Sequence, residues 1–152
     1  MNLYTSLIVT IISVTTALPP NSQHRFLTSI GDRQYYIENY LKANWELAFL
    51  TCRKRGLHLV SLEEKTYLKQ LKDYLSKNDL RDKSFWTSAT NKNLDSWYWF
   101  GVGEPFKDDI EGDSNNEGGH CLTMKGDFFH STNCNSTNYF ICEYIPNPSS
   151  RY

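Results

Sequence analysis

Apolar side chains follow two different spacings in the first half of the chain. Residues 33–40 (RQYYIENY) combine aromatic and β-branched side chains with partial alternation, which predicts an opening β-strand. Gly56 stands where a left-handed C-terminal cap would end a helix. The helix before it is indicated by apolar positions at i, i+3, i+4 and i+7, which form one helical face: Trp45, Ala48, Phe49 and Cys52.

A second helix is expected after a short extended link at 57–60. Ser61 and Glu64 have the spacing of a capping box, in which two side chains satisfy backbone groups at a helix start. His58, within the link, is interpreted as a surface or bridging residue and not as a ligand. The apolar stripe of this second helix consists of Tyr67, Leu68, Leu71 and Leu75.

After Lys83 the chain becomes rich in aromatic and β-branched residues, which predicts a sheet with long loops. Two helices packed on a mainly antiparallel sheet describe an α+β fold. A long loop runs from Gly101 to Gly119, and loops of this length are usually functional or disordered. The strands are expected at 84–89, 97–100, 120–124, 127–130 and 139–144.

The N-terminus carries a short apolar run that ends in small residues. Leu3–Ala17 has the composition of a signal peptide, with cleavage expected after Ala17, so the protein is expected to be secreted and extracellular. The run is too short to span a bilayer, which needs about 20 apolar residues. The predicted organisation is a signal peptide at 1–17, an unstructured tail at 18–32, one domain at 33–145 and a second tail at 146–152.

The charge balance argues against nucleic acid as a partner. The formal net charge is -1, whereas proteins that follow nucleic-acid phosphates carry a clustered basic surplus. The densest charge cluster is acidic and lies in the long loop, where it is either a binding site or a solvated loop rich in turn-forming residues. Its members are Asp108, Asp109, Glu111, Asp113 and Glu117.

The cysteine count is even, as expected for a chain that enters the oxidising secretory route. Four cysteines predict two disulfides, and the count alone leaves three connectivities open. No CxxC pair occurs, which argues against a zinc finger or ribbon. Asn135 begins a glycosylation sequon, Asn135-Ser136-Thr137, which is consistent with secretion.

Together these segments resemble the C-type lectin-like domains over residues 34–144. The resemblance implies the C-type lectin-like fold and the disulfides Cys52–Cys142 and Cys121–Cys134, which would stabilise it by about 2–4 kcal/mol each. It is carried by Tyr35–Ile37, the helix Lys42–Cys52, the join Leu59–Glu64, Phe85–Thr87, Trp97–Trp99, the spacing of Cys121, Cys134 and Cys142, and the terminal Tyr139–Glu143.

The resemblance also implies a candidate calcium site in the long loop. Sugar-binding members hold calcium with the oxygens of an EPN stretch and a WND motif, and two sugar hydroxyls complete the ion's shell. Residues 112–116 resemble the EPN stretch and supply Asp113 and Asn115, while Glu117 is a candidate third ligand. Glu104, followed by Pro105, begins a second candidate for the same stretch.

The WND positions differ from those of the sugar-binding members. Counting back from Cys134 places Phe129, His130 and Ser131 there, so an amide and a carboxylate are both missing. Because calcium affinity depends on the number of charged ligands, this loss weakens the predicted site. His130 is either a polar ligand contact or a strand-end residue packed beside the two preceding phenylalanines.

Two binding functions are therefore open. One, implied by the resemblance, is a secreted lectin that recognises glycans on cell or microbial surfaces, of the kind used in innate recognition or found in saliva and venom. The other is an ion-independent module that binds a protein ligand through the same long-loop surface. Its candidate anchors, which core packing would equally explain, are Trp97, Tyr98, Phe100 and Phe106.

Catalysis is not expected. Ser131 follows His130 directly, and adjacent residues of a strand point to opposite faces, so they cannot form a nucleophile and base pair. A glycosidase needs two rigid, opposed carboxyl groups, whereas the acidic residues here share one Gly-interrupted loop.

Overall fold

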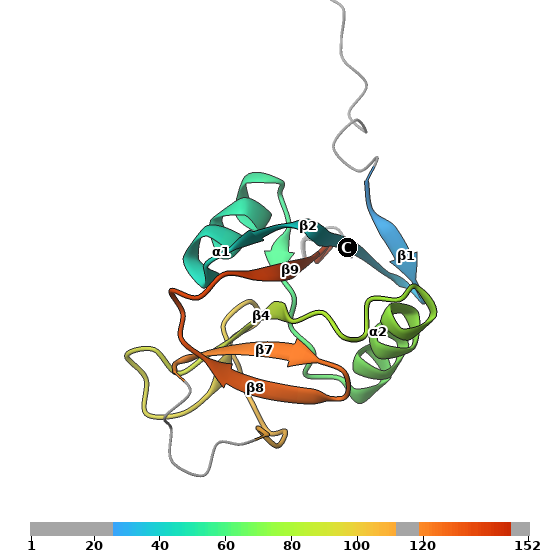
Figure 1. Cartoon of the computed structure of the whole chain (residues 1–152). Coiled ribbons are helices and arrows are strands. Elements are labelled where there is room, and N and C mark those ends of the chain that lie inside the picture. Colours follow the sequence, from blue (N-terminus) through green and yellow to red (C-terminus); the bar gives the residue numbers. More distant parts are fainter. Residues whose placement is uncertain (1–25, 112–118, 147–152) are drawn as a thin grey trace, which may run out of the picture.

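The computed structural model describes residues 26–111 and 119–146. The predicted signal peptide and its cleavage site lie outside the described residues. Figure 1 shows two helices packed against strands that come from both halves of the chain. The strands are β1 Thr28–Ile30, β2 Arg33–Ala43, β3 His58–Leu59, β4 Phe85–Thr90, β5 Tyr98–Trp99, β6 Glu104–Pro105, β7 Cys121–Lys125, β8 Phe128–Thr132 and β9 Asn138–Glu143, and the helices are α1 Trp45–Lys54 and α2 Lys65–Lys77.

One sheet connects these strands in the order β1-β2-β9-β4-β5-β6, with β3 on β9 and the β7–β8 hairpin on β4. The prediction of an α+β fold with a mainly antiparallel sheet is confirmed, and one pair, β4 and β9, runs parallel, so the sheet is mixed. This pairing joins a strand of the middle of the chain to the last strand, a contact that no local pattern specifies. As a result, β9 lies between β2 and β4 and connects the two halves of the fold (Figure 1).

β1 corrects the expectation that residues 18–32 carry no structure. Thr28 to Ile30 pair antiparallel with Tyr35 to Arg33 across a turn that contains Gly31. Gly31 has φ +63°, a left-handed conformation that favours glycine. Ile30 of β1 is buried in the core. The strand was not predicted because three residues are too few to show an alternating pattern.

α1 forms as its sequence predicts. The Asn44 side chain accepts a hydrogen bond from the Leu47 N–H at 2.9 Å and so caps the N-terminus. Trp45, Ala48 and Cys52 are buried, and the chain leaves the helix through Gly56 at φ +70°.

The capping box predicted for α2 is wrong. The helix begins at Lys65, and its N-cap residue, Glu64, makes no side-chain cap bond. Ser61 is instead fully buried, with its hydroxyl 2.7 Å from that of Ser88 and its N–H donating to Glu143. The leucines of the predicted stripe, Leu68, Leu71 and Leu75, are buried as expected.

Two buried clusters surround the sheet. One includes the α2 leucines and the aromatic residues Phe85, Trp99 and Phe129. The other lies under α1 and contains Trp45 and Trp86, whose indole N–H groups each donate 2.8 Å bonds to backbone carbonyls. Both tryptophans are therefore core residues whose polar atoms are satisfied inside the fold.

The disulfide pairing implied by the resemblance is confirmed. Cys52–Cys142 ties α1 to the last strand, and Cys121–Cys134 ties the start of β7 to the loop after β8. The second bridge holds the hairpin that lies beside the long loop.

Candidate functional site

The predicted binding region is centred on β8, which is the outer strand of the β7–β8 hairpin. Phe129 is buried and belongs to the core, whereas His130 is about one-third exposed. Across the hairpin, His130 faces Thr123 and Ser131 faces Leu122. Because side chains alternate along a strand, His130 and Ser131 point to opposite faces of β8. The imidazole of His130 is therefore not placed to act as a base for the Ser131 hydroxyl.

The open edge of β8 holds the middle of the long loop. Ile110 forms a parallel bridge with Phe129, and the Glu111 N–H donates a 2.8 Å hydrogen bond to the Phe129 carbonyl. The Glu111 carboxylate lies 3.5 Å from Nε2 of His130 and pairs with it when the ring is protonated. Glu111 was predicted only as part of the acidic cluster, because nothing local connects it with His130.

An aromatic cluster packs the first part of the loop against the core. The Phe106 ring lies 5.2 Å from that of Trp99 and 5.3 Å from that of Phe129, measured between centroids. Trp97 also packs against this core. Of the four candidate anchors, only Phe100 is exposed, at 53%, and Tyr98 is half-buried.

The return of the loop to β7 is shaped by Gly119. Its φ is +127°, and a Cβ atom there would come within 2.5 Å of the backbone at Thr132 and Asn133. Only glycine fits this close approach. The neighbouring His120 ring contacts the Asn91 side chain at 2.9 Å, consistent with a structural role.

Glu104, the second candidate for the EPN stretch, lies away from His130 and Ser131. It is exposed on β6 and lines a groove of about 450 Å³ beside the start of α2. Neither His130 nor Ser131 lines that groove. In the same groove Lys65 forms an ion pair with Asp108, so this member of the acidic cluster is already neutralised.

The described half of the candidate calcium site does not fit the ion. Calcium prefers six to eight oxygen ligands, mostly carboxylates and carbonyls. At the WND positions the Phe129 side chain is in the core, and His130 supplies a ring nitrogen beside Glu111. Asp113, Asn115 and Glu117 lie outside the described residues, and within 26–111 and 119–146 no group of three or more metal-ligating side chains gathers.

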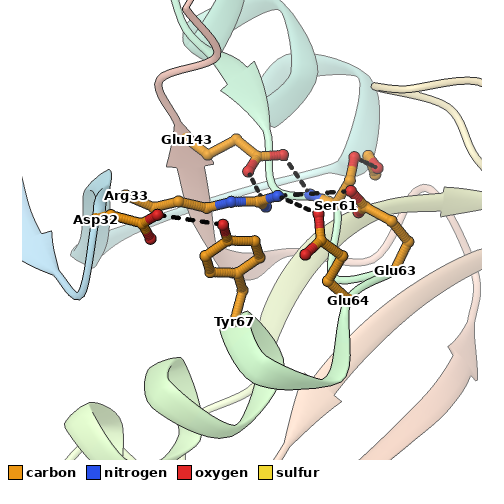
Figure 2. Close-up of polar contacts among 8 residues, drawn as sticks. Asp32, Arg33, Ser61, Glu63, Glu64, Tyr67 and Glu143 are labelled. Carbon is orange, nitrogen blue, oxygen red and sulfur yellow. Dashed lines mark hydrogen bonds and ion pairs between the residues drawn. The ribbon is translucent and has the colours of Figure 1, made fainter.

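Figure 2 shows a second polar cluster, centred on Arg33 and Glu143. The guanidinium lies 3.2 Å from the Glu143 carboxylate and stacks 3.5 Å above the Tyr67 ring. Glu143 is almost fully buried and also accepts the Ser61 N–H at 2.7 Å. Burial raises the pKa of Glu143 to about 7, against the opposing effects of the Ser61 N–H and Arg33.

This cluster borders a cleft of about 570 Å³, but its main role is to connect segments of the fold. Arg33 is on β2, Glu143 on β9 and Ser61 in the join before α2, so their contacts hold three segments together (Figure 2). No pattern in the sequence predicted this cluster. The available signal was a charged residue, Glu143, directly after the apolar run Tyr139–Cys142 of β9.

The predicted sequon lies on the surface between β8 and β9. Asn135 is exposed, and its N–H donates a 2.9 Å bond to the Asn133 side chain. The position is accessible to a glycan, and glycosylation itself stays a prediction. Among the helices of the described ranges, none is long and apolar enough to cross a membrane.

Comparison with known proteins agrees with this architecture. The lectin C-type domain family matches residues 41–144, which is more than half of the chain. The chain belongs to the C-type lectin domain family. The C-type lectin fold with its two disulfides is therefore established for this protein.

Several solved C-type lectin folds are similar to the whole domain. The mouse scavenger receptor C-type lectin carbohydrate-recognition domain has a TM-score of 0.68 and 23% identity, and the match covers 81% of this chain and 96% of that one. The C-type lectin domain of murine dendritic cell inhibitory receptor 2, solved in complex with N-glycan, has a TM-score of 0.65 and 17% identity, covering 79% and 96%. A calcium-independent type II antifreeze protein has a TM-score of 0.63 and 20% identity, covering 80% and 92%. At these identities the likeness concerns the fold alone.

Proposed function

We propose that this chain is a secreted lectin that binds carbohydrate through its long-loop surface independently of calcium. The observation that carries the proposal is which side chains stand at the WND positions of β8 and what they contact. Phe129 is committed to the core and His130 faces Glu111, so β8 offers no carboxylate or amide side chain to an ion. Secretion is supported by the apolar N-terminal run and the two disulfides.

Glu111 and His130 supply the chemistry that a sugar requires. The carboxylate accepts hydrogen bonds and the imidazole can donate or accept, so the pair can engage neighbouring hydroxyl groups directly. Their side chains are 51% and 32% exposed. Because the backbone of Glu111 is bonded to Phe129, this pair is held on β8 before a ligand arrives.

The similar folds support both parts of the proposal. One of them is a receptor domain in complex with N-glycan, and another is calcium-independent by its description. The fold therefore accommodates glycan recognition in one case and dispenses with calcium in another.

The test is a glycan array probed with the chain from residue 18 onward, in calcium and in EDTA. We expect the same glycans to bind in both media. Glu111→Ala and His130→Ala should each weaken binding about tenfold to hundredfold, since hydrogen bonds to charged groups contribute about 1.5–3 kcal/mol. Ser76→Ala, on the exposed surface of α2, is the matched control and should change nothing.

A thermal scan in calcium and EDTA on the wild type and Asp113→Ala addresses the ion separately. A calcium-dependent rise in midpoint that Asp113→Ala abolishes would contradict the calcium-independent part of the proposal, because a ligand of the native state stabilises it. Folded protein that binds no glycan in either medium would contradict the carbohydrate part. The alternative is then a protein ligand at the exposed Phe100, which packs edge-on against Phe49 at 5.6 Å.

A further inference from the structure

A short segment of β2 projects from the sheet. Glu38 pairs with Phe140 and Ala43 with Asn138, so four residues of β2 stand opposite Tyr139 alone. The surplus residues bulge outward, and two of them carry large apolar side chains at the surface. Tyr40 is 87% exposed and Leu41 is 71% exposed. We refer to these two residues as the Tyr40–Leu41 tip.

The tip is held in shape from below. The Glu38 carboxylate accepts the backbone N–H groups of Tyr40 at 3.0 Å and Leu41 at 3.1 Å. Its second oxygen accepts the Tyr36 hydroxyl at 2.6 Å, and Glu38 is itself buried. A buried carboxylate thus fixes the backbone whose side chains remain in solvent, so the exposed tip has a defined conformation.

Two ammonium groups lie beside the tip. Lys83 donates a 3.0 Å hydrogen bond to the Asn39 carbonyl, next to Tyr40. The ammonium groups of Lys42 and Lys83 lie 5.0 and 4.7 Å from the centroid of one ring, that of Tyr139. No salt bridge joins either lysine to a carboxylate within the described parts of the chain.

We propose that the Tyr40–Leu41 tip is a contact site for an anionic phospholipid surface. Tyrosine and leucine suit the boundary between headgroups and acyl chains, because one end of the tyrosine is apolar and the other hydrogen-bonds water. Lysines near an acidic membrane surface each add attraction to the lipid phosphates. The tip and its two lysines combine both features on one rigid protrusion.

The shape of the tip favours a lipid surface over a folded protein. A stable protein interface buries about 800 Å² on each partner and requires a complementary surface. Two adjacent side chains on a convex bulge cover much less. A bilayer accommodates such a protrusion without any matching shape.

The experiment is co-sedimentation of the full chain from residue 18 with vesicles of phosphatidylcholine alone or mixed with phosphatidylserine. We expect sedimentation with the mixed vesicles, weakening as salt is added, and little with phosphatidylcholine. The double variant Tyr40→Ser, Leu41→Ser should bind at least about tenfold more weakly, from the lost apolar burial. Lys42→Gln with Lys83→Gln should remove the preference for phosphatidylserine.

Leu47→Ser with Leu50→Ser is the matched control, since these α1 leucines are 54% and 52% exposed. The control should bind as the wild type does. An equal loss in this control, no binding by the wild type, or unchanged binding by the tip variant would each overturn the proposal.

A second readout avoids reliance on the double variant folding. In Leu41→Trp, brominated phosphatidylserine vesicles should quench fluorescence beyond the quenching seen for the wild-type tryptophans. No additional quenching would likewise overturn the proposal, and capture of the tip by a soluble acidic protein in place of vesicles would do the same.

Discussion

Glu143 is the residue whose chemistry depends most on its surroundings. It is 1% exposed, yet it faces Arg33 and receives the Ser61 N–H. The ionised carboxylate loses more hydration free energy on burial than its interactions with Arg33 and Ser61 restore. The pKa of Glu143 therefore rises to about 7. The same residue connects β9 with β2 and with the segment before α2.

The titration of the Glu143 carboxyl should make the stability of the protein depend on pH. Since its folded pKa lies above the ordinary value of 4.5, the folded state binds the proton more tightly than the unfolded state. The stability that this carboxyl contributes in its protonated form is therefore fully present below about pH 4.5 and is lost as the pH rises through about 7. At about 1.4 kcal/mol per pKa unit, we expect the unfolding free energy of the wild type to fall by about 3 kcal/mol relative to Glu143→Gln over this range.

Urea unfolding of both proteins at a series of pH values measures this difference, because titrations common to both proteins cancel. Parallel curves for the two proteins would mean that Glu143 does not titrate in this window.

At the scale of elements, the two helices begin in different ways. α1 has a side-chain cap from Asn44, whereas α2 has none from Glu64. The S-x-x-E pattern before α2 was a reasonable helix-start signal, but burial against β4 takes the Ser61 hydroxyl to Ser88. A local motif was overruled by a contact between segments 27 residues apart.

Asn44→Ala should destabilise the protein by about 1 kcal/mol, because the Leu47 N–H loses its partner. Glu64→Ala, the equivalent change at the start of α2, should cost less, since that side chain makes no cap bond and its ion pair with Arg33 is exposed. Guanidinium unfolding of the two variants compares them directly. Equal costs would argue against the assigned cap.

At the scale of the whole molecule, the two disulfides constrain the chain differently. Cys52–Cys142 closes 90 residues and links the two ends of the domain, while Cys121–Cys134 closes 13. A cross-link stabilises partly by limiting the unfolded chain, and the effect grows slowly with loop length.

Replacing Cys52 and Cys142 together by alanine should therefore lower the unfolding free energy by about 4.5 kcal/mol. The corresponding replacement of Cys121 and Cys134 should lower it by about 3 kcal/mol. Denaturant unfolding under non-reducing conditions provides both values. The reverse order would indicate that the hairpin beside the long loop depends on its bridge for more than chain entropy.

The sequence by itself was sufficient for the local elements of this protein. Both helices and the main strands follow from patterns that act within about ten residues, and the disulfide pairing followed from the family resemblance. Tertiary structure alone decided the parallel pairing of β4 with β9, the ion pair of Arg33 with Glu143 and the contact of Glu111 with His130. The physical reason is that each of these joins residues far apart in the chain, so its partner is chosen by packing and by the need to satisfy polar groups excluded from water.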